Sequence, residues 1–201
     1  MAVDTLDLIT PDEAKRLVAI SSANTDQDAE LEVFITAVSR RIDELAGPVV
    51  VRTLTNEAHN GGCTSIRLNY APVSSFTTVT EYLNTSATVL TAETNATKTS
   101  TNYLWDSTVQ RLYRRSAGQD AYFPAGRKNV TITYIAGRAA TTAAVDEKFK
   151  RAAGVILAHL WRADRGSGSE TFGEYSYPVG FAIPNRALEI LGDDLRAPLV
   201  A

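Results

Sequence analysis

The feature that most constrains the fold is a change of residue pattern at two places along the chain. Residues 10–47 and residues from 141 onward carry apolar side chains at three- and four-residue steps, which is typical of amphipathic helices. Between them, residues 49–137 are rich in β-branched and aromatic residues and are interrupted by turn residues. A β segment enclosed by two helical segments predicts an α+β fold, in which a small bundle of about four helices holds an inserted antiparallel β subdomain.

The pattern also predicts where these parts begin and end. We expect an N-terminal helical part at residues 1–48 and the inserted β subdomain at 49–140. The C-terminal helical part would follow at 141–192, with a long loop at 166–183, and a tail at 193–201.

The first two helices have readable ends. Thr10-Pro11-Asp12-Glu13 combines an N-cap, a proline suited to the first turn and the glutamate of a capping box, so a short helix should run to about Ile20. A second helix is predicted over Asp28–Ala46, where Gly47-Pro48 ends it.

The middle of the chain predicts several strands. Val130, Ile132 and Tyr134 alternate with other residues, as in a strand with one buried face. Thr91–Asn102 is polar without a period, which favours an exposed hairpin tip or loop that stays flexible until bound. The predicted strands are Val49–Val51, Ser65–Tyr70, Ser74–Leu83, Tyr103–Trp105, Val109–Tyr113 and Val130–Ile135.

A long apolar helix is predicted after Asp146, closed by the basic segment Arg162–Arg165. Its stretch Ala152–Trp161 has no charged residue, and a helix that is apolar all round is usually buried on more than one side. Two interpretations stay open: contact with a neighbouring subunit, or the centre of the monomer core. The candidate subunit-interface residues are Val155, Ala158, His159 and Trp161.

Composition excludes several classes of protein. The 201 residues include 20 basic and 23 acidic side chains, a formal charge of −3, which argues against a generic nucleic-acid binder. One cysteine excludes an internal disulfide framework and an all-cysteine zinc site. No secretory signal and no stretch near the ~20 apolar residues of a membrane span is present, so we expect a soluble protein with no membrane partner.

No catalytic constellation is evident, and no metal ligands, cofactor or enzymatic activity are predicted. Cys63 could act as a nucleophile with His59 or His159 as base, but a small strand-face cysteine is the favoured interpretation. Asp193-Asp194 could bind a cation or act as paired acids, and an ordinary solvated pair is favoured instead.

Basic side chains gather around two predicted strands. Arg111, Arg114 and Arg115 surround one, and Arg127-Lys128 opens the next. They could contact phosphate or acidic partners, but the favoured interpretation is a solvated β edge protected by charge.

The order of several motifs resembles the head-to-tail connector (adaptor) proteins of long-tailed bacteriophages, over about residues 6–192. Each motif is weak alone, and the resemblance depends on their order. The Thr-rich insertion Thr85–Asn102 departs from shorter members of that family. The motifs are Leu8–Lys15, Ala46–Pro48, Tyr70–Val73, Val130–Gly137 and Trp161–Arg165.

The resemblance implies a structural virion protein of the neck, at the capsid portal vertex, made in the bacterial host cytoplasm. Adaptors form a ring, typically of twelve subunits, beneath the portal protein, and the ring extends the DNA channel. The implied partners are the portal protein, neighbouring adaptor subunits and the next neck protein, a stopper or tail-completion protein. Double-stranded DNA would pass without specific contacts, which suits the acidic balance.

In this family the C-terminal region commonly engages the portal. Here that implies the Phe172–Phe181 loop and the tail Leu195–Ala201. A stopper or tail-completion protein of the same neck is the alternative, followed by a small cytoplasmic enzyme. The candidate portal or neck contacts are Phe172, Tyr175, Tyr177, Phe181, Leu195, Arg196, Pro198, Leu199 and Val200.

Overall fold

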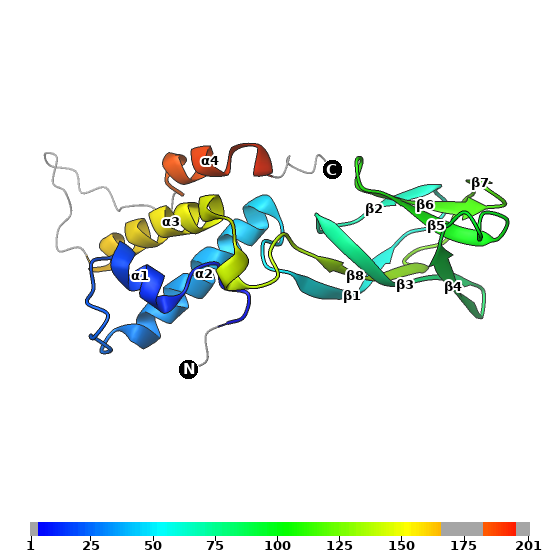
Figure 1. The fold of residues 1–201 in the computed structure, drawn as a ribbon. Helices are drawn as coiled ribbons and strands as arrows, with labels where there is room; N and C mark the ends of the chain where they lie inside the picture. The colour runs from blue at the N-terminus through cyan, green and yellow to red at the C-terminus, as the bar shows by residue number, and fades with distance from the viewer. Residues whose placement is uncertain (1–3, 166–182, 196–201) are drawn as a thin grey trace, which may run out of the picture. The chain divides into compact units, whose positions relative to one another are not determined.

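The computed structural model describes residues 4–165 and 183–195 of the chain, and its α+β class confirms the prediction (Figure 1). The chain divides into two compact units. One, the helical unit, comprises Met1–Val51 and Arg138–Ala201, and the other, the β unit, comprises Arg52–Gly137. Each unit has a hydrophobic core of its own.

The helical unit is built on two long helices with shorter ones packed on them (Figure 1). Its α-helices are α1 (Pro11–Leu17), α2 (Asp28–Ala46), α3 (Glu147–Arg165) and α4 (Asn185–Leu191), and its 3₁₀ helices are η1 (Thr142–Ala144) and η2 (Gly192–Asp194).

Local sequence sets the start of α1 and both ends of α2 as predicted, whereas α1 ends at Leu17 and not near Ile20. The Glu13 amide donates to Thr10 Oγ1 at 3.3 Å, and the Thr10 amide donates to Glu13 Oε2 at 2.8 Å, which completes the capping box. Helix α2 has the predicted bounds and ends at Gly47, whose φ of 85° suits a residue without a side chain.

The core of the helical unit lies where the apolar stripe of α2 meets α3. Leu31, Ile35 and Ile42 of α2 are at most 1% exposed, as the stripe predicts. On α3, Phe149 and Leu157 are also buried. Burial of each such side chain stabilises the fold by roughly 1.5–3 kcal/mol before the entropy of ordering is counted.

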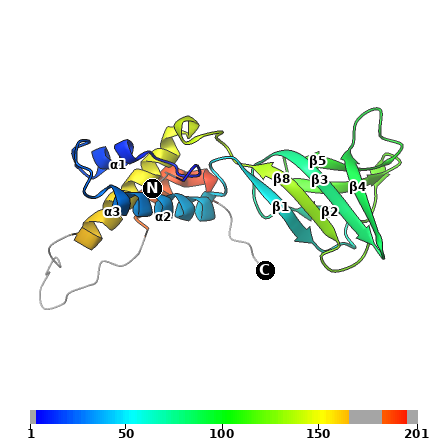
Figure 2. The ribbon, with the colours of Figure 1, turned by 90° about the horizontal axis from the view of Figure 1, so that it is seen from below.

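The β unit is one eight-stranded sheet that folds into two layers (Figure 2). The strand order is β1-β8-β3-β4-β5-β6-β2, with β7 paired to β6, and all pairings are antiparallel except the short one between β4 and β5. The strands are β1 (Arg52–His59), β2 (Ser65–Arg67), β3 (Val73–Leu83), β4 (Ser86–Ala92), β5 (Thr101–Asp106), β6 (Arg111–Ser116), β7 (Gln119–Asp120) and β8 (Val130–Ala136).

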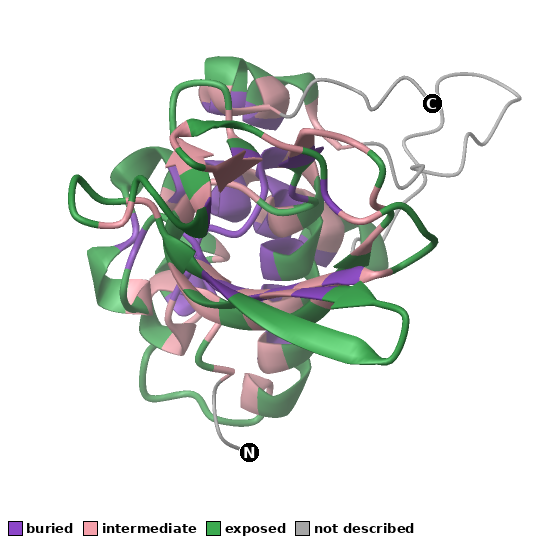
Figure 3. Cartoon of the chain, turned by 90° about the vertical axis from the view of Figure 1, so that its right-hand side faces the viewer, coloured by how far each residue is buried: buried purple, intermediate pink, exposed green. Residues whose placement is uncertain are grey.

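The core of the β unit lies between the layer β1-β8-β3-β4 and the layer that contains β5, β6 and β2. Val130, Ile132 and Tyr134 alternate as predicted and are fully buried. Phe76 of β3 meets Trp105 of β5 across the layers, with ring centroids 5.2 Å apart. Buried residues line the interior, while most of β4 is exposed (Figure 3).

One strand prediction was wrong, and one loop prediction needs its ends corrected. Val49–Val51 forms no strand, because Val49 and Val50 pack into the core of the helical unit, with only an isolated bridge from Val50 to Ala139. The predicted loop Thr91–Asn102 is mostly exposed over residues 93–100, but its ends belong to β4 and β5, and Asn102 is fully buried.

Candidate functional site

The C-terminal contact candidates fall mostly outside the described residues. Phe172, Tyr175, Tyr177 and Phe181 lie there, as do Arg196, Pro198, Leu199 and Val200. Leu195 is described: it packs against the helical core, and its amide donates to the Gly192 carbonyl at 3.1 Å. The structure therefore places the start of the predicted tail on the helical unit.

The subunit-interface candidates on α3 differ in burial. Trp161 is 7% exposed and meets Phe34 of α2 edge to face, with ring centroids 5.6 Å apart, so contacts within the chain account for its burial. Val155, Ala158 and His159 are only partly buried. These three keep surface that a neighbouring subunit could cover.

A pocket of about 320 Å³ in the helical unit gathers the charged groups of three segments. Arg138 Nη2 lies 3.5 Å from Asp194 Oδ1, and Lys148 Nζ pairs with the other carboxylate oxygen of Asp194. Both cations also lie over the Phe149 ring, at 5.4 and 5.2 Å from its centroid. Asp194 of η2 is thus held by two ion pairs, so the prediction of an ordinary solvated pair is wrong for this residue.

A second polar cluster lies within the β unit. Glu57 Oε2 accepts a hydrogen bond of 2.6 Å from the Tyr134 hydroxyl, and Glu57 Oε1 lies 2.6 Å from His59 Nε2 and accepts from the Asn69 amide. Burial opposes ionisation of Glu57, yet the hydrogen bonds from His59, Tyr134 and the Asn69 amide lower its pKa overall. Burial, together with the bond to Glu57, raises the pKa of Tyr134.

The Glu57 cluster ties the edge strand β1 to β8 and to the segment before β3. Sequence reasoning missed it, although Glu57 and His59 are two residues apart in a strand and therefore share a face.

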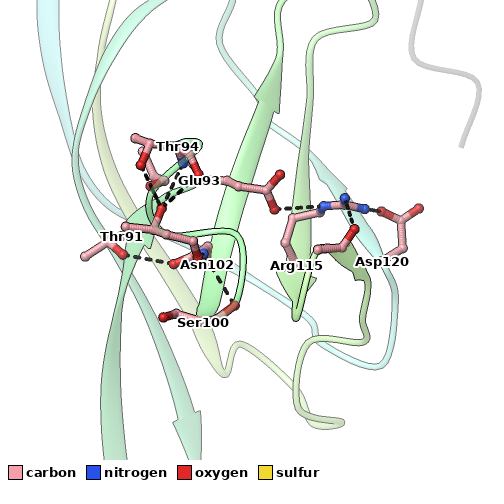
Figure 4. A network of polar contacts seen from close by, with 10 residues as sticks. Thr91, Glu93, Thr94, Ser100, Asn102, Arg115 and Asp120 are labelled. Carbon is pink, nitrogen blue, oxygen red and sulfur yellow. Dashed lines mark hydrogen bonds and ion pairs between the residues drawn. The ribbon is translucent and has the colours of Figure 1, made fainter.

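The basic cluster is used inside the fold. Arg114 Nε and Nη2 donate to the two carboxylate oxygens of Glu81 at 2.7 and 3.0 Å, and this pairing raises the pKa of Arg114. Arg115 pairs with Glu93 at 3.1 Å and with Asp120 (Figure 4). The predicted solvated β edge is wrong for Arg114 and Arg115, and their partners leave them poorly suited to hold phosphate.

The Thr-rich segment is ordered by its own hydrogen bonds (Figure 4). Asn102 Oδ1 accepts from Thr91 Oγ1 at 3.1 Å, and its amide nitrogen donates to the carbonyls of Thr97 and Ser100. The Thr94 amide donates to Thr97 Oγ1 at 2.8 Å. These bonds hold the mostly exposed loop 93–100 against β5.

The described residues form no catalytic pair around Cys63. Its thiol donates to the Asn60 carbonyl at 3.7 Å, while His59 pairs with Glu57. Among the same residues, no group of three His, Cys, Asp or Glu side chains could hold a metal ion. No helix in the described part of the chain is long and apolar enough to cross a membrane.

Comparison with known proteins gives a match in fold. No family model matches the chain, and no curated protein matches it. A chain in the structure described as the neck of an empty GTA particle computed with C6 symmetry has a TM-score of 0.58 at 18% identity, over 93% of this chain and 92% of that chain.

A second match is a chain in the virion of a native gene transfer agent (GTA) particle. Its TM-score is 0.56 at 17% identity, over 90% of this chain and 88% of that chain. At these identities the likeness shows that the fold is shared.

Proposed function

We propose that this chain is a structural protein of the neck of a phage-like virion, and that within the neck it is the head-to-tail adaptor. The observation that carries the proposal is the extent of the fold match, which spans 93% of this chain and 92% of a chain from a GTA neck. A match over nearly the whole of both chains includes the helical unit and the β unit together. That combination is more specific than one common fold module would be.

The chemistry of the described residues supports a structural role without turnover. The buried carboxylate Glu81 and the cation Arg114 neutralise one another, and Glu57 is engaged by His59 and Tyr134. Each of these groups has its partners within the fold, where the contacts stabilise the β unit. Ion pairing of Arg114 and Arg115 also suits a protein that DNA passes without being gripped.

The adaptor role brings specific partners. The portal protein would bind the C-terminal region, for which Phe172–Phe181 and Leu195–Ala201 are the candidates. Copies of the chain would form a ring, typically of twelve, with Val155, Ala158 and His159 of α3 as candidate contacts. The next neck protein, a stopper or tail-completion protein, would bind the completed ring.

The decisive experiment deletes the gene for this chain and examines the particles that are then produced. Loss of an adaptor should leave DNA-filled heads and free tails that electron microscopy shows unjoined, and the purified chain should restore joining when added. Particles with normal necks in the absence of the chain would contradict the neck role.

A second experiment separates the adaptor from the stopper. The purified chain is mixed with purified portal protein, and complex formation is followed by sedimentation and electron microscopy. An adaptor binds the portal directly, whereas a stopper binds only when another neck protein is already present. Deletion of residues 196–201 should abolish portal binding and leave the circular dichroism and thermal unfolding of the chain unchanged. If the truncated chain unfolds, the tail belongs to the core and the portal assignment is wrong.

A further inference from the structure

The layer β1-β8-β3-β4 of the β unit has an open edge on each side. Strand β1 pairs with β8, and no other strand in the described part of the chain pairs with it. Strand β4 pairs with β3 along Ser86–Leu90, but its other side pairs with β5 only at Thr91 and Ala92. Most of β4 therefore presents unpaired backbone groups outward, at the outer margin of the layer (Figure 2).

The β4 edge has none of the devices that usually prevent edge strands from pairing. Ser86–Ala92 contains no charged residue, no proline and no glycine, and its register with β3 has no bulge. Edge strands of proteins that remain monomeric usually carry a lysine, a proline or a bulge at such a place. Val89 at the middle of this edge is 62% exposed.

The outer face of the same layer is uncharged from one edge to the other. One row runs across all four strands as Ala58, Thr131, Thr80 and Val89, and the next row pairs Thr133 with Thr78. The outer face of the opposite layer differs, since Asp106 lies across from Arg111 in β5 and β6. The absence of charge is thus a property of one layer and not of the whole β unit.

The directions of the two edges match each other. Successive strands in β1-β8-β3-β4 are all antiparallel, so β4 runs opposite to β1. A second copy placed beside β4 in the same orientation would bring its β1 alongside as an antiparallel neighbour, the arrangement already found within the layer. Contact between two different edges is heterologous, and a heterologous contact repeats into a ring when its rotation closes.

The β1 edge can be covered without burying an unpaired charge. Its acidic group Glu57 is already bonded to His59, Tyr134 and the Asn69 amide. The bulge between Leu54 and Glu57 makes β1 irregular and so disfavours pairing of β1 with a second β1. Pairing of β1 with a second β1 would bring two bulges together, whereas pairing of β1 with β4 involves only one. Pairing of β4 with a second β4 is the competing arrangement, and the cross-linking test below measures it.

We propose that β4 of one copy pairs with β1 of the next copy, so that the uncharged layer continues from subunit to subunit. The proposal deepens the proposed function, because it names a contact by which copies in the neck ring would join. In this arrangement Val89 of one copy lies beside Ala58 of its neighbour, and the row of small and β-branched side chains is extended.

The test is a cross-linking experiment on the full chain. Two variants are made in a Cys63→Ser background, one with Ala58→Cys in β1 and one with Ala87→Cys in β4, and they carry tags of different mass. They are mixed at high concentration, and separately co-assembled in particles, then treated with a short bis-maleimide linker that tolerates small changes of register. We expect the mixed 58–87 product to exceed each like-with-like product at least tenfold.

Two lysine variants supply the matched comparison. Val89→Lys in the variant that carries Ala87→Cys should reduce the 58–87 product to the yield of the like-with-like products. Val33→Lys in α2 should leave the 58–87 product unchanged, because Val33 is as exposed as Val89, at 61%, but lies outside the proposed contact. Circular dichroism should show both variants folded. The proposal is overturned if the 58–87 yield is no greater than twice each like-with-like product, both in solution and in particles. It is also overturned if Val33→Lys reduces the 58–87 product and Val89→Lys does not. If the 58–87 product forms but the chain proves unnecessary for joining heads to tails, the proposed function is refuted and the edge pairing stands.

Discussion

The ion pair between Arg114 and Glu81 offers the sharpest test of what holds the β unit together. The two side chains are 16% and 8% exposed, and both carboxylate oxygens accept from the guanidinium. Replacement Arg114→Met keeps the apolar stem and removes the charge, which leaves Glu81 buried without its partner. Breaking a buried pair in this way costs about 3–5 kcal/mol. Because Arg114 retains some exposure, we expect the lower end, about 3 kcal/mol in the free energy of unfolding.

The assay can isolate the β unit. The chain has two tryptophans, Trp105 in β5 and Trp161 in α3, so Trp161→Phe leaves Trp105 as the reporter. Trp105 packs against Phe76, which makes its fluorescence sensitive to loss of the β core. Urea unfolding in this background gives the free energy of the β unit with and without Arg114→Met.

The double variant Arg114→Met with Glu81→Leu separates charge from packing. It should lie within about 1 kcal/mol of the background, because an apolar pair of similar volume replaces a buried ion pair at little cost. A loss below about 1 kcal/mol for Arg114→Met alone would mean that the pair behaves as an exposed one. A double variant as unstable as the single one would refute the argument, because the loss would then come from packing of Arg114.

Substitutions at three further positions test other parts of the structure. Glu57→Gln should destabilise the β unit at neutral pH, because the folded state lowers the pKa of Glu57 and so favours its charged form. The difference in stability from wild type should shrink as the pH falls below 4.5, the usual pKa of a glutamate, and a difference that does not depend on pH would contradict this argument. Gly61→Ala should lower the free energy of unfolding in urea by at least about 1–3 kcal/mol, because the added Cβ would lie 1.8 Å from the Pro124 carbonyl oxygen. An unchanged free energy would show that the turn can relax around the added Cβ. Gly154→Ala should change the free energy of unfolding by less than about 1 kcal/mol, because alanine favours the helix while the half-exposed Leu17 side chain can move away from the new Cβ. Gly154→Leu should cost about 1–3 kcal/mol, because the larger side chain would push α1 away from α3.

The helices were predictable because their signals are local. The capping box at Thr10 and Glu13 and the glycine at position 47 act within one turn of the chain, and the apolar stripe of α2 shows its period in sequence. The same holds for β8, whose alternation survives in the burial pattern.

The missed strands lack such a local signal. Strand β1 contains the bulge near Asn56, whose φ of 54° interrupts the alternation, so Arg52–His59 does not read as a strand. Strand β4 is threonine-rich and follows a turn at Asn84, and it merges in sequence with the polar loop after it. Val49 and Val50 show the opposite error, since their strand-like composition reflects burial in the core of the helical unit.

The polar contacts were less predictable still, because their partners are distant in sequence. Arg114 and Glu81 are 33 residues apart, and Tyr134 and Glu57 are 77 apart. A cluster of arginines looks like a charged surface until the fold brings carboxylates to Arg114 and Arg115. Sequence could name Arg114 and Arg115 as notable, but only the sheet register assigns them to Glu81 and Glu93.

The two layers of the β unit make opposite use of polar residues, and that difference bears on assembly. In the layer with β5 and β6, Arg115 pairs with Glu93 and Asp120, so charge is present and locally neutralised. In the layer with β3 and β4, the outer face relies on threonine and valine, with Val89 largely exposed. β-branched residues lower the free energy of a sheet most when neighbouring strands cover them. Within one copy the edge at β4 lacks that cover along Ser86–Leu90, and a neighbouring strand would supply it, so the composition of this layer is better explained by a sheet that continues beyond the single chain.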